Sequence, residues 1–164
     1  MEVLLVSPVK PIHIIFAKMI PYFIISCIVL TIVLTLSFTV LEIPMLGTLH
    51  WVILESLIYI LLALTIGLFV STMVDSQLVA TLICAIIFML PMLLLSGMLF
   101  PIESMPRFFQ VISNIIPARW YIAAIKKLMI QGVEFQFVIK ETLSLITMTI
   151  ALLAASLKKF KETL

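Results

Sequence analysis

The stretch MIPYFIISCIVLTIVLTLSFTVL, residues 19–41, decides the fold because it is long, apolar and free of charged side chains. A helix rises about 1.5 Å per residue, so a helix of this length exceeds the roughly 30 Å hydrocarbon layer of a bilayer. Pro21 falls in the first turn, where a missing N–H is tolerated, and Tyr22 lies where aromatic side chains gather at the interface. The stretch therefore predicts a membrane-spanning helix.

The composition of the chain agrees with this prediction. Of its 164 residues, 64% are apolar and 11% are charged, compared with about half and about a quarter in soluble domains. Several apolar blocks exceed the 18 or so residues that indicate a span rather than a buried core helix. We therefore expect an all-α integral membrane protein with a single transmembrane domain over residues 1–164. The net charge of +2 and the lack of a long basic run argue against a nucleic-acid partner.

Three further apolar blocks predict three further spans, with short turns between the first three. These blocks cover residues 51–73, 78–100 and 138–157. Trp51 would anchor the second span at the interface. The last apolar run is short, so Lys140 would belong to its helix and reach the interface along its aliphatic stem. The chain thus predicts four transmembrane helices.

The third predicted span contains residues that disfavour a straight helix. Pro91 lies near its middle, and Ser96 and Gly97 lie near its end, where kinking or unwinding is expected. These residues either shape helix packing, which is the simpler interpretation, or form a gating hinge.

The loop between the third and last spans, residues 101–137, is neither a span nor an ordinary polar loop. Pro101, Pro106 and Pro117 divide it into a turn and two short helical pieces, because proline is tolerated at helix starts but not inside. Both pieces are amphipathic, and Arg119 lies on the polar side of the second. The loop is therefore expected to lie at the membrane interface or to dip into it.

The positive-inside rule does not orient this chain. Four spans put both termini on one side of the membrane, and the basic residues divide equally between the two sides. One side holds Lys10, Lys18, Lys158, Lys159 and Lys161, and the other holds Arg107, Arg119, Lys126, Lys127 and Lys140.

No catalytic or metal-binding pattern is apparent in the sequence. The chain has no Gly-rich phosphate loop, and its two histidines, His13 and His50, flank the first span. Cys27 and Cys84 lie apart in apolar blocks, as expected of small packing residues. An enzyme embedded in the membrane would need acids, histidines or lysines that converge at one depth, so this class is disfavoured, and we expect neither a cofactor nor a metal in the chain.

Glu55 is the one acid well inside an apolar block. Acids at such positions are costly and often functional. Glu55 lies only about one turn from Trp51, however, so a carboxylate hydrogen-bonded to a neighbour near the interface is favoured over an ion or proton site.

Two stretches resemble the permease subunits of ABC type-2 transporters, a bacterial export class. They are MEVLLVSPVKPIHIIFAKMIPY, residues 1–22, and LLLSGMLFPIESMPRFFQVISNIIPARWYIAAIKKLMIQGVEF, residues 93–135. The second is the more specific, since Ser-Gly, Phe-Pro-Ile-Glu-x-Met-Pro and Ile-Pro-x-Arg-Trp-Tyr recur together in that family. The resemblance covers essentially the whole chain.

The resemblance implies an arrangement of the chain in the cytoplasmic membrane with both termini in the cytoplasm. Residues 1–18 would be the coupling segment, residues 101–137 an external re-entrant helical hairpin and residues 158–164 a cytoplasmic tail. The coupling residues would be Leu4, Leu5, Val6 and Ser7, with Pro8 at the end of the coupling helix. The hairpin and gate region would include Ser96, Gly97, Pro101, Pro106, Pro117 and Arg119.

The resemblance also implies partners. ATP would be bound and hydrolysed by a separate ABC ATP-binding subunit, and a second permease subunit, identical or different, would complete the membrane part among the surrounding lipids. A complete family member has six spans, so this chain is expected to be a C-terminal part, as a truncated reading frame, a split subunit or a misassigned start. The first apolar block is expected to be retained, since Glu2 and the short apolar run before Ser7 do not form a signal peptide.

The expected function is that of a permease subunit that exports an amphipathic substrate, such as a drug or a lipid. The alternative is a non-transporting four-span scaffold or permease remnant that binds other membrane subunits. The sequence does not name the substrate, because apolar export paths carry little readable specificity.

Overall fold

The computed structural model describes residues 11–43, 46–74 and 76–163, and it is helical with no strand in that part of the chain. The all-α fold class is therefore confirmed. Four helices are long and apolar enough to cross a membrane. The expected coupling residues Leu4, Leu5, Val6, Ser7 and Pro8 lie outside the described residues.

The four candidate spans follow the four apolar blocks. The first is α1 (Pro11–Thr39) and the second is α2 (Leu49–Ser71). The third is continuous through α3 (Gln77–Ile83), η2 (Cys84–Met89) and α4 (Leu90–Leu95). The fourth is α7 (Ile139–Thr163), which remains helical through residues expected to form the tail.

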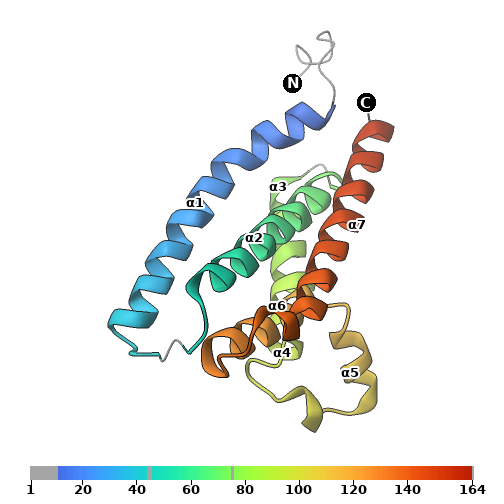
Figure 1. Cartoon of the computed structure of the whole chain (residues 1–164). Helices are drawn as coiled ribbons and strands as arrows, with labels where there is room; N and C mark the ends of the chain where they lie inside the picture. The colour runs from blue at the N-terminus through green and yellow to red at the C-terminus, as the bar shows by residue number, and fades with distance from the viewer. Residues whose placement is uncertain (1–10, 44–45, 75, 164) are drawn as a thin grey trace.

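Figure 1 shows how the spans are arranged. The beginning of α1 and the end of α7 lie at one end of the molecule, and α5 (Arg107–Ser113) and α6 (Pro117–Ile125) lie at the opposite end. Helix α2 is central, since it contacts α1, α3, α6 and α7.

Burial is concentrated on α2, α6 and α7. One core cluster lies near α6 and includes Val52, Ala124 and Leu128, and the other lies along α2 and includes Leu62 and Leu145. By contrast, no residue is buried in the spans Phe16–Thr39 and Gln77–Leu95. The apolar faces of α1 and of the third span are therefore largely uncovered within this chain.

The third span contains the irregularity expected around Pro91. The ring of Pro91 cannot donate to the carbonyl of Ile87 and conflicts with it sterically, so an α-helix is disturbed one turn earlier. The π-helical η2 occupies that turn and ends at Met89. The helix itself ends at Leu95, before the expected end of the span at residue 100.

The turn between α1 and α2 is docked on η4 (Lys126–Ile130), the π-helical continuation of α6. The amide of Leu46 donates to the carbonyl of Met129 at 3.1 Å. A Cβ on Gly47 would overlap the carbonyl oxygen of Leu128, and Gly132 adopts a φ of 61° with Leu46 against it. These two glycines permit a close backbone approach that side chains would block.

Candidate functional site

The residues after the third span form a helical hairpin, which we define as residues 96–130. It contains η3 (Ile102–Ser104), then α5, then α6 and η4. The axis of α5 and the axis of the α6–η4 helix differ by 86°, a bend typical of a broken span or a re-entrant loop. Helix α7 follows after η5 (Phe135–Phe137).

The three prolines expected to punctuate this region each precede or start a helical piece. Pro101 precedes η3, Pro106 precedes α5, and Pro117 is the first residue of α6. A proline at these positions loses no helical hydrogen bond, because the first amides of a helix have no partner within it. The local sequence therefore explains where each piece begins.

Arg119 holds the corner between α5 and α6. Its Nη1 atom donates to the carbonyl of Gln110 at 3.0 Å and to Oγ of Ser113 at 2.6 Å. The indole of the next residue, Trp120, donates to the carbonyl of Asn114 at 2.9 Å. The carbonyls at the end of α5 thus receive donors from the first turn of α6, and a cation there is favourable for the helix dipole.

Four of the expected gate residues line one cavity of about 520 Å³, and two do not. Ser96, Gly97, Pro101 and Arg119 are in its wall, together with Lys126. Gly97 adopts a φ of 80°, which favours glycine, and its carbonyl accepts from Nζ of Lys126 at 3.1 Å.

Pro106 and Pro117 lie outside the lining of this cavity. Pro117 is buried at the start of α6, whereas Pro106 is exposed before α5. The structure therefore gives these two prolines a role in shaping the hairpin rather than in lining a cavity.

Glu55 is fully buried on α2 and faces α7. Oγ1 of Thr142 donates to its Oε1 atom, while Oε2 has no partner among the described residues. Glu141, the neighbour of Thr142, accepts from Nζ of Lys127 at 2.9 Å in an ion pair. Charged and polar groups of α2, α7 and η4 therefore meet at the hairpin end of the bundle.

Two further contacts join α2 to α6. The hydroxyls of Ser56 and Tyr121 lie 3.0 Å apart, and the rings of Tyr59 and Tyr121 are stacked with centroids 4.4 Å apart. We give the name polar seam to the residues of this paragraph and the preceding one that make contacts between α2, α7 and the hairpin. The polar seam fixes the hairpin to α2 and α7. Its members are Glu55, Ser56, Tyr59, Tyr121, Lys127, Glu141 and Thr142.

Glu55 is the only member of this seam that the sequence predicted as a candidate site residue. Thr142 and Tyr121 are distant in the sequence from the α2 residues that they contact, and both belong to common residue types. Their contacts with α2 follow from the packing of the helices and are not indicated by the local sequence. The one local signal was the position of Lys127 in the amphipathic loop, residues 101–137.

A second cavity, of about 550 Å³, is almost entirely apolar. Tyr59 and Gly67 of α2, Met92 of α4 and Ile122 of α6 contribute to its wall. Among the described residues, no group of three or more His, Cys, Asp or Glu side chains is placed to hold a metal ion. The two cavities are suited to binding a small molecule, and the buried polar seam is suited to coupling the hairpin to α2 and α7.

Comparison with known proteins identifies relatives along nearly the whole chain. The chain is 30% identical to the probable multidrug ABC transporter permease YbhS of Escherichia coli K12 over 132 residues, covering 80% of this chain and 35% of that protein. It is 29% identical to the probable multidrug ABC transporter permease YbhR over 162 residues, with 99% and 44% covered. It is 28% identical to the inner membrane transport permease YhhJ over 164 residues, with the same coverage.

The chain spans less than half the length of these curated relatives. No solved structure shows a significant match. A family model described as ABC-2 family transporter protein matches residues 1–158. The resemblance noted in the two sequence stretches is therefore confirmed, and the chain belongs to the ABC-2 family of transporter proteins.

Proposed function

We propose that this chain is part of a permease subunit in an ATP-driven exporter of the cytoplasmic membrane, with an amphipathic drug or lipid as substrate. Family membership and relatives named as permeases support the proposal. The structural observation that carries it is the bent hairpin, which closes one end of a four-span bundle and is fixed there by the polar seam.

In this proposal, both termini face the cytoplasm and the hairpin faces the outside. The beginning of α1 and the end of α7 lie at the same end of the molecule, opposite α5, as an even number of spans requires (Figure 1). The hairpin would then cover the outer end of the translocation path.

We propose that the ATP-binding subunit acts on residues 1–18, of which residues 11–18 form the first turns of α1. Leu4, Leu5, Val6 and Ser7 would contact the ATP-binding subunit, and Pro8 would end the coupling helix. Closure of two ATP-binding subunits would push this segment and shift α1 against the rest of the bundle. The absence of buried residues in the span Phe16–Thr39 supports this movement, since few packed contacts would have to break.

The proposed result of this push is a change at the first residues of the hairpin, directly after the third span ends. Ser96, Gly97 and Pro101 lie there, between α4 and η3. Arg119 clamps the corner of the hairpin, so the corner would move as a unit while the loop around Gly97 takes up the change in backbone angles. A second permease subunit, identical or different, would provide the facing wall of the path.

The test uses the complete assembly from the native membrane. A tagged chain is isolated in mild detergent, its partners are identified by mass spectrometry, and ATP-driven transport is measured after reconstitution. We expect an ATP-binding subunit to be recovered, and we expect the double variant Leu4→Asp and Leu5→Asp to abolish transport. The conservative pair Leu4→Met and Leu5→Met is the matched control and should retain it. Normal transport by the Asp variant would reject the coupling assignment.

A non-transporting membrane scaffold is the second candidate function. Its support is the uncovered apolar surface of α1 and of the third span, which other membrane helices could cover. Deletion of the chain distinguishes the two functions, because export would continue without a scaffold remnant and would stop without a permease.

A further inference from the structure

The apolar cavity and the hairpin cavity described above are neighbours with a common wall. Ser96, Met98 and Ile122 line both of them. The two cavities therefore lie side by side, and we refer to them together as the hollow, with an apolar part and a polar part.

The apolar part runs along α2 toward the middle of the bundle. Tyr59 and Gly67 line it and are eight positions apart, which corresponds to about 12 Å along a helix. Met89 and Met92 contribute flexible side chains to the opposite wall. An apolar cavity that extends along a helix and has adaptable methionine side chains in its wall suits a hydrocarbon chain.

The polar part lies at the hairpin end and carries an excess of positive charge. Arg119 and Lys126 line it together with one acid, Glu103. The oxygens that accept from the two cations belong to neutral groups, such as the carbonyls of Gln110 and Gly97. Within the part of the chain that the structure describes, neither cation forms an ion pair with a carboxylate.

We propose that this hollow binds one acidic phospholipid, with its phosphate between Arg119 and Lys126 and an acyl chain in the apolar part. Charge complementarity favours an anion at the polar end, and arginine and lysine are the side chains that recognise phosphate. The hollow also has the orientation of a bilayer lipid, with its polar end at the hairpin and its apolar end toward the middle of α2. A bound lipid would join α4 to the hairpin.

This inference goes beyond the proposed function, because lipid binding by the isolated full chain requires no ATP-binding subunit. Failure of the transport experiment would leave it standing, and failure of lipid binding would leave the transport proposal standing.

The experiment is native mass spectrometry of the purified full chain in mild detergent, titrated with phosphatidylglycerol or with phosphatidylethanolamine of the same acyl chains. We expect one phosphatidylglycerol to bind about tenfold more tightly than phosphatidylethanolamine. Lys126→Gln should remove most of this preference, and Lys126→Arg should keep it.

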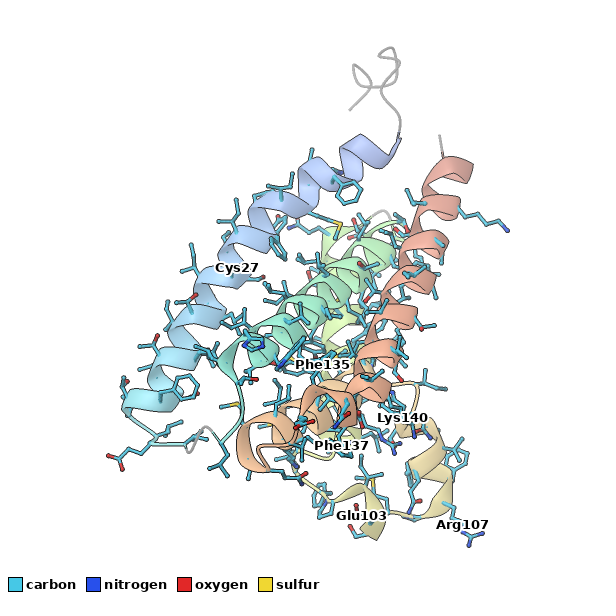
Figure 2. The ribbon with its side chains drawn as sticks, viewed as in Figure 1. Cys27, Glu103, Arg107, Phe135, Phe137 and Lys140 are labelled. Carbon is cyan, nitrogen blue, oxygen red and sulfur yellow. The ribbon has the colours of Figure 1, made fainter. Side chains whose placement is uncertain are left out.

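The matched control is Arg107→Gln. Arg107 is an exposed cation whose side chain extends outward from α5 (Figure 2), and it does not line either cavity. Its replacement should leave the lipid preference unchanged. Circular dichroism and the elution volume report whether each variant remains folded.

A second variant tests the apolar part independently of the charges. Met89 is 61% exposed at the rim of the apolar part, so Met89→Trp should narrow the hollow without disturbing a buried core. We expect phosphatidylglycerol binding to weaken severalfold. This variant also carries the test if Lys126→Gln fails to fold.

Three results of the lipid titrations would overturn the proposal. These are equal binding of the two lipids by the unmodified chain, an unchanged preference in folded Lys126→Gln, and unchanged phosphatidylglycerol binding in Met89→Trp. Soluble glycerol 3-phosphate is added as a competitor. Competition at the same concentration as the lipid would identify a site for free phosphate and would also contradict it.

Discussion

Helices α1 and α2 are both apolar spans, yet they use their polar side chains in different ways. In α1, the hydroxyls of Thr31, Thr35 and Thr39 each donate to a carbonyl one turn earlier in the same helix. In α2, Glu55 and Ser56 also contact side chains of α7 and α6. Polar side chains therefore fix α2 to neighbouring helices. The hydroxyls of α1 form hydrogen bonds within α1 itself, and α1 remains loosely packed.

This difference explains why equally apolar segments are not equivalent. In lipid, apolar side chains gain little from burial against other apolar side chains, so close packing and hydrogen bonds between helices decide which helices stay together. The α2, α6 and α7 group has both, whereas α1, on which Figure 2 labels Cys27, contributes no buried residue to either core cluster. The contrast predicts large effects of substitution in the first group and small ones in α1.

The largest effect is expected from shortening a core side chain. Leu62 of α2 is fully buried, so Leu62→Ala leaves a cavity and should lower the free energy of unfolding by about 2–5 kcal/mol. Leu36 of α1 is 49% exposed, and Leu36→Ala should change the free energy of unfolding by less than about 0.5 kcal/mol. Denaturant titration in detergent micelles measures both, and equal losses would contradict the contrast.

The next effect concerns the docking of the α1–α2 turn on the hairpin. Gly47→Ala places a methyl group against the backbone of Leu128, and we expect a loss of roughly 1–3 kcal/mol through strain. Gly67 is the matched control, since a methyl group there meets no atom within 4 Å apart from the neighbouring backbone of its own helix. A thermal melt should show a lower midpoint for Gly47→Ala alone. If both variants melted together, the close approach at Gly47 would be disproved.

A smaller effect is expected at the polar seam. Ser56→Ala and Tyr121→Phe each remove one hydroxyl of the pair, and a double-mutant cycle should give a coupling of about 0.6 kcal/mol, the average for hydrogen bonds between membrane helices. Pairing Tyr121→Phe with Ser37→Ala of α1 gives the control cycle, which should be additive. Additivity in both cycles would show that the hydroxyls of Ser56 and Tyr121 do not interact.

The smallest effect is expected inside α1. Thr35→Val removes a hydroxyl that bonds only to its own helix, so stability should change by less than about 0.5 kcal/mol. Thr142→Val is the comparison, because the Thr142 hydroxyl also contacts Glu55 of another helix. The comparison fails if the Thr35 variant is the less stable of the two.

Much of the fold could be predicted because it depends on local sequence. Uncharged apolar blocks of sufficient length specify spans, and Pro106 and Pro117 specify where α5 and α6 begin. Pro91 indicated the irregular turn in the third span, although not that it would be π-helical. The end of α7 was less predictable, because the lysines after residue 157 favour helix as strongly as they favour a polar tail.

The candidate site was harder to predict because it depends on distant residues. Arg119 was recognised in the loop, but its bonds to Gln110 and Ser113 require the 86° bend between two short helices. The partner of Glu55 was expected to be a neighbour, yet no local pattern distinguishes Thr142 from the other threonines of the last span. Pairing across helices is a tertiary property, so these contacts emerged only from the packed structure.

The central claim is that the hairpin and α2 move as one unit during transport, while α1 moves against them. The most direct test places spin labels at exposed positions of the assembled transporter, in a variant with Cys27 and Cys84 replaced by serine. The labels pair Leu61→Cys of α2 with Ile130→Cys of η4 or with Val33→Cys of α1. On ATP binding, the account predicts an unchanged distance between α2 and η4 and a shifted distance between α2 and α1. A shift between α2 and η4 with a constant distance between α2 and α1 would contradict it.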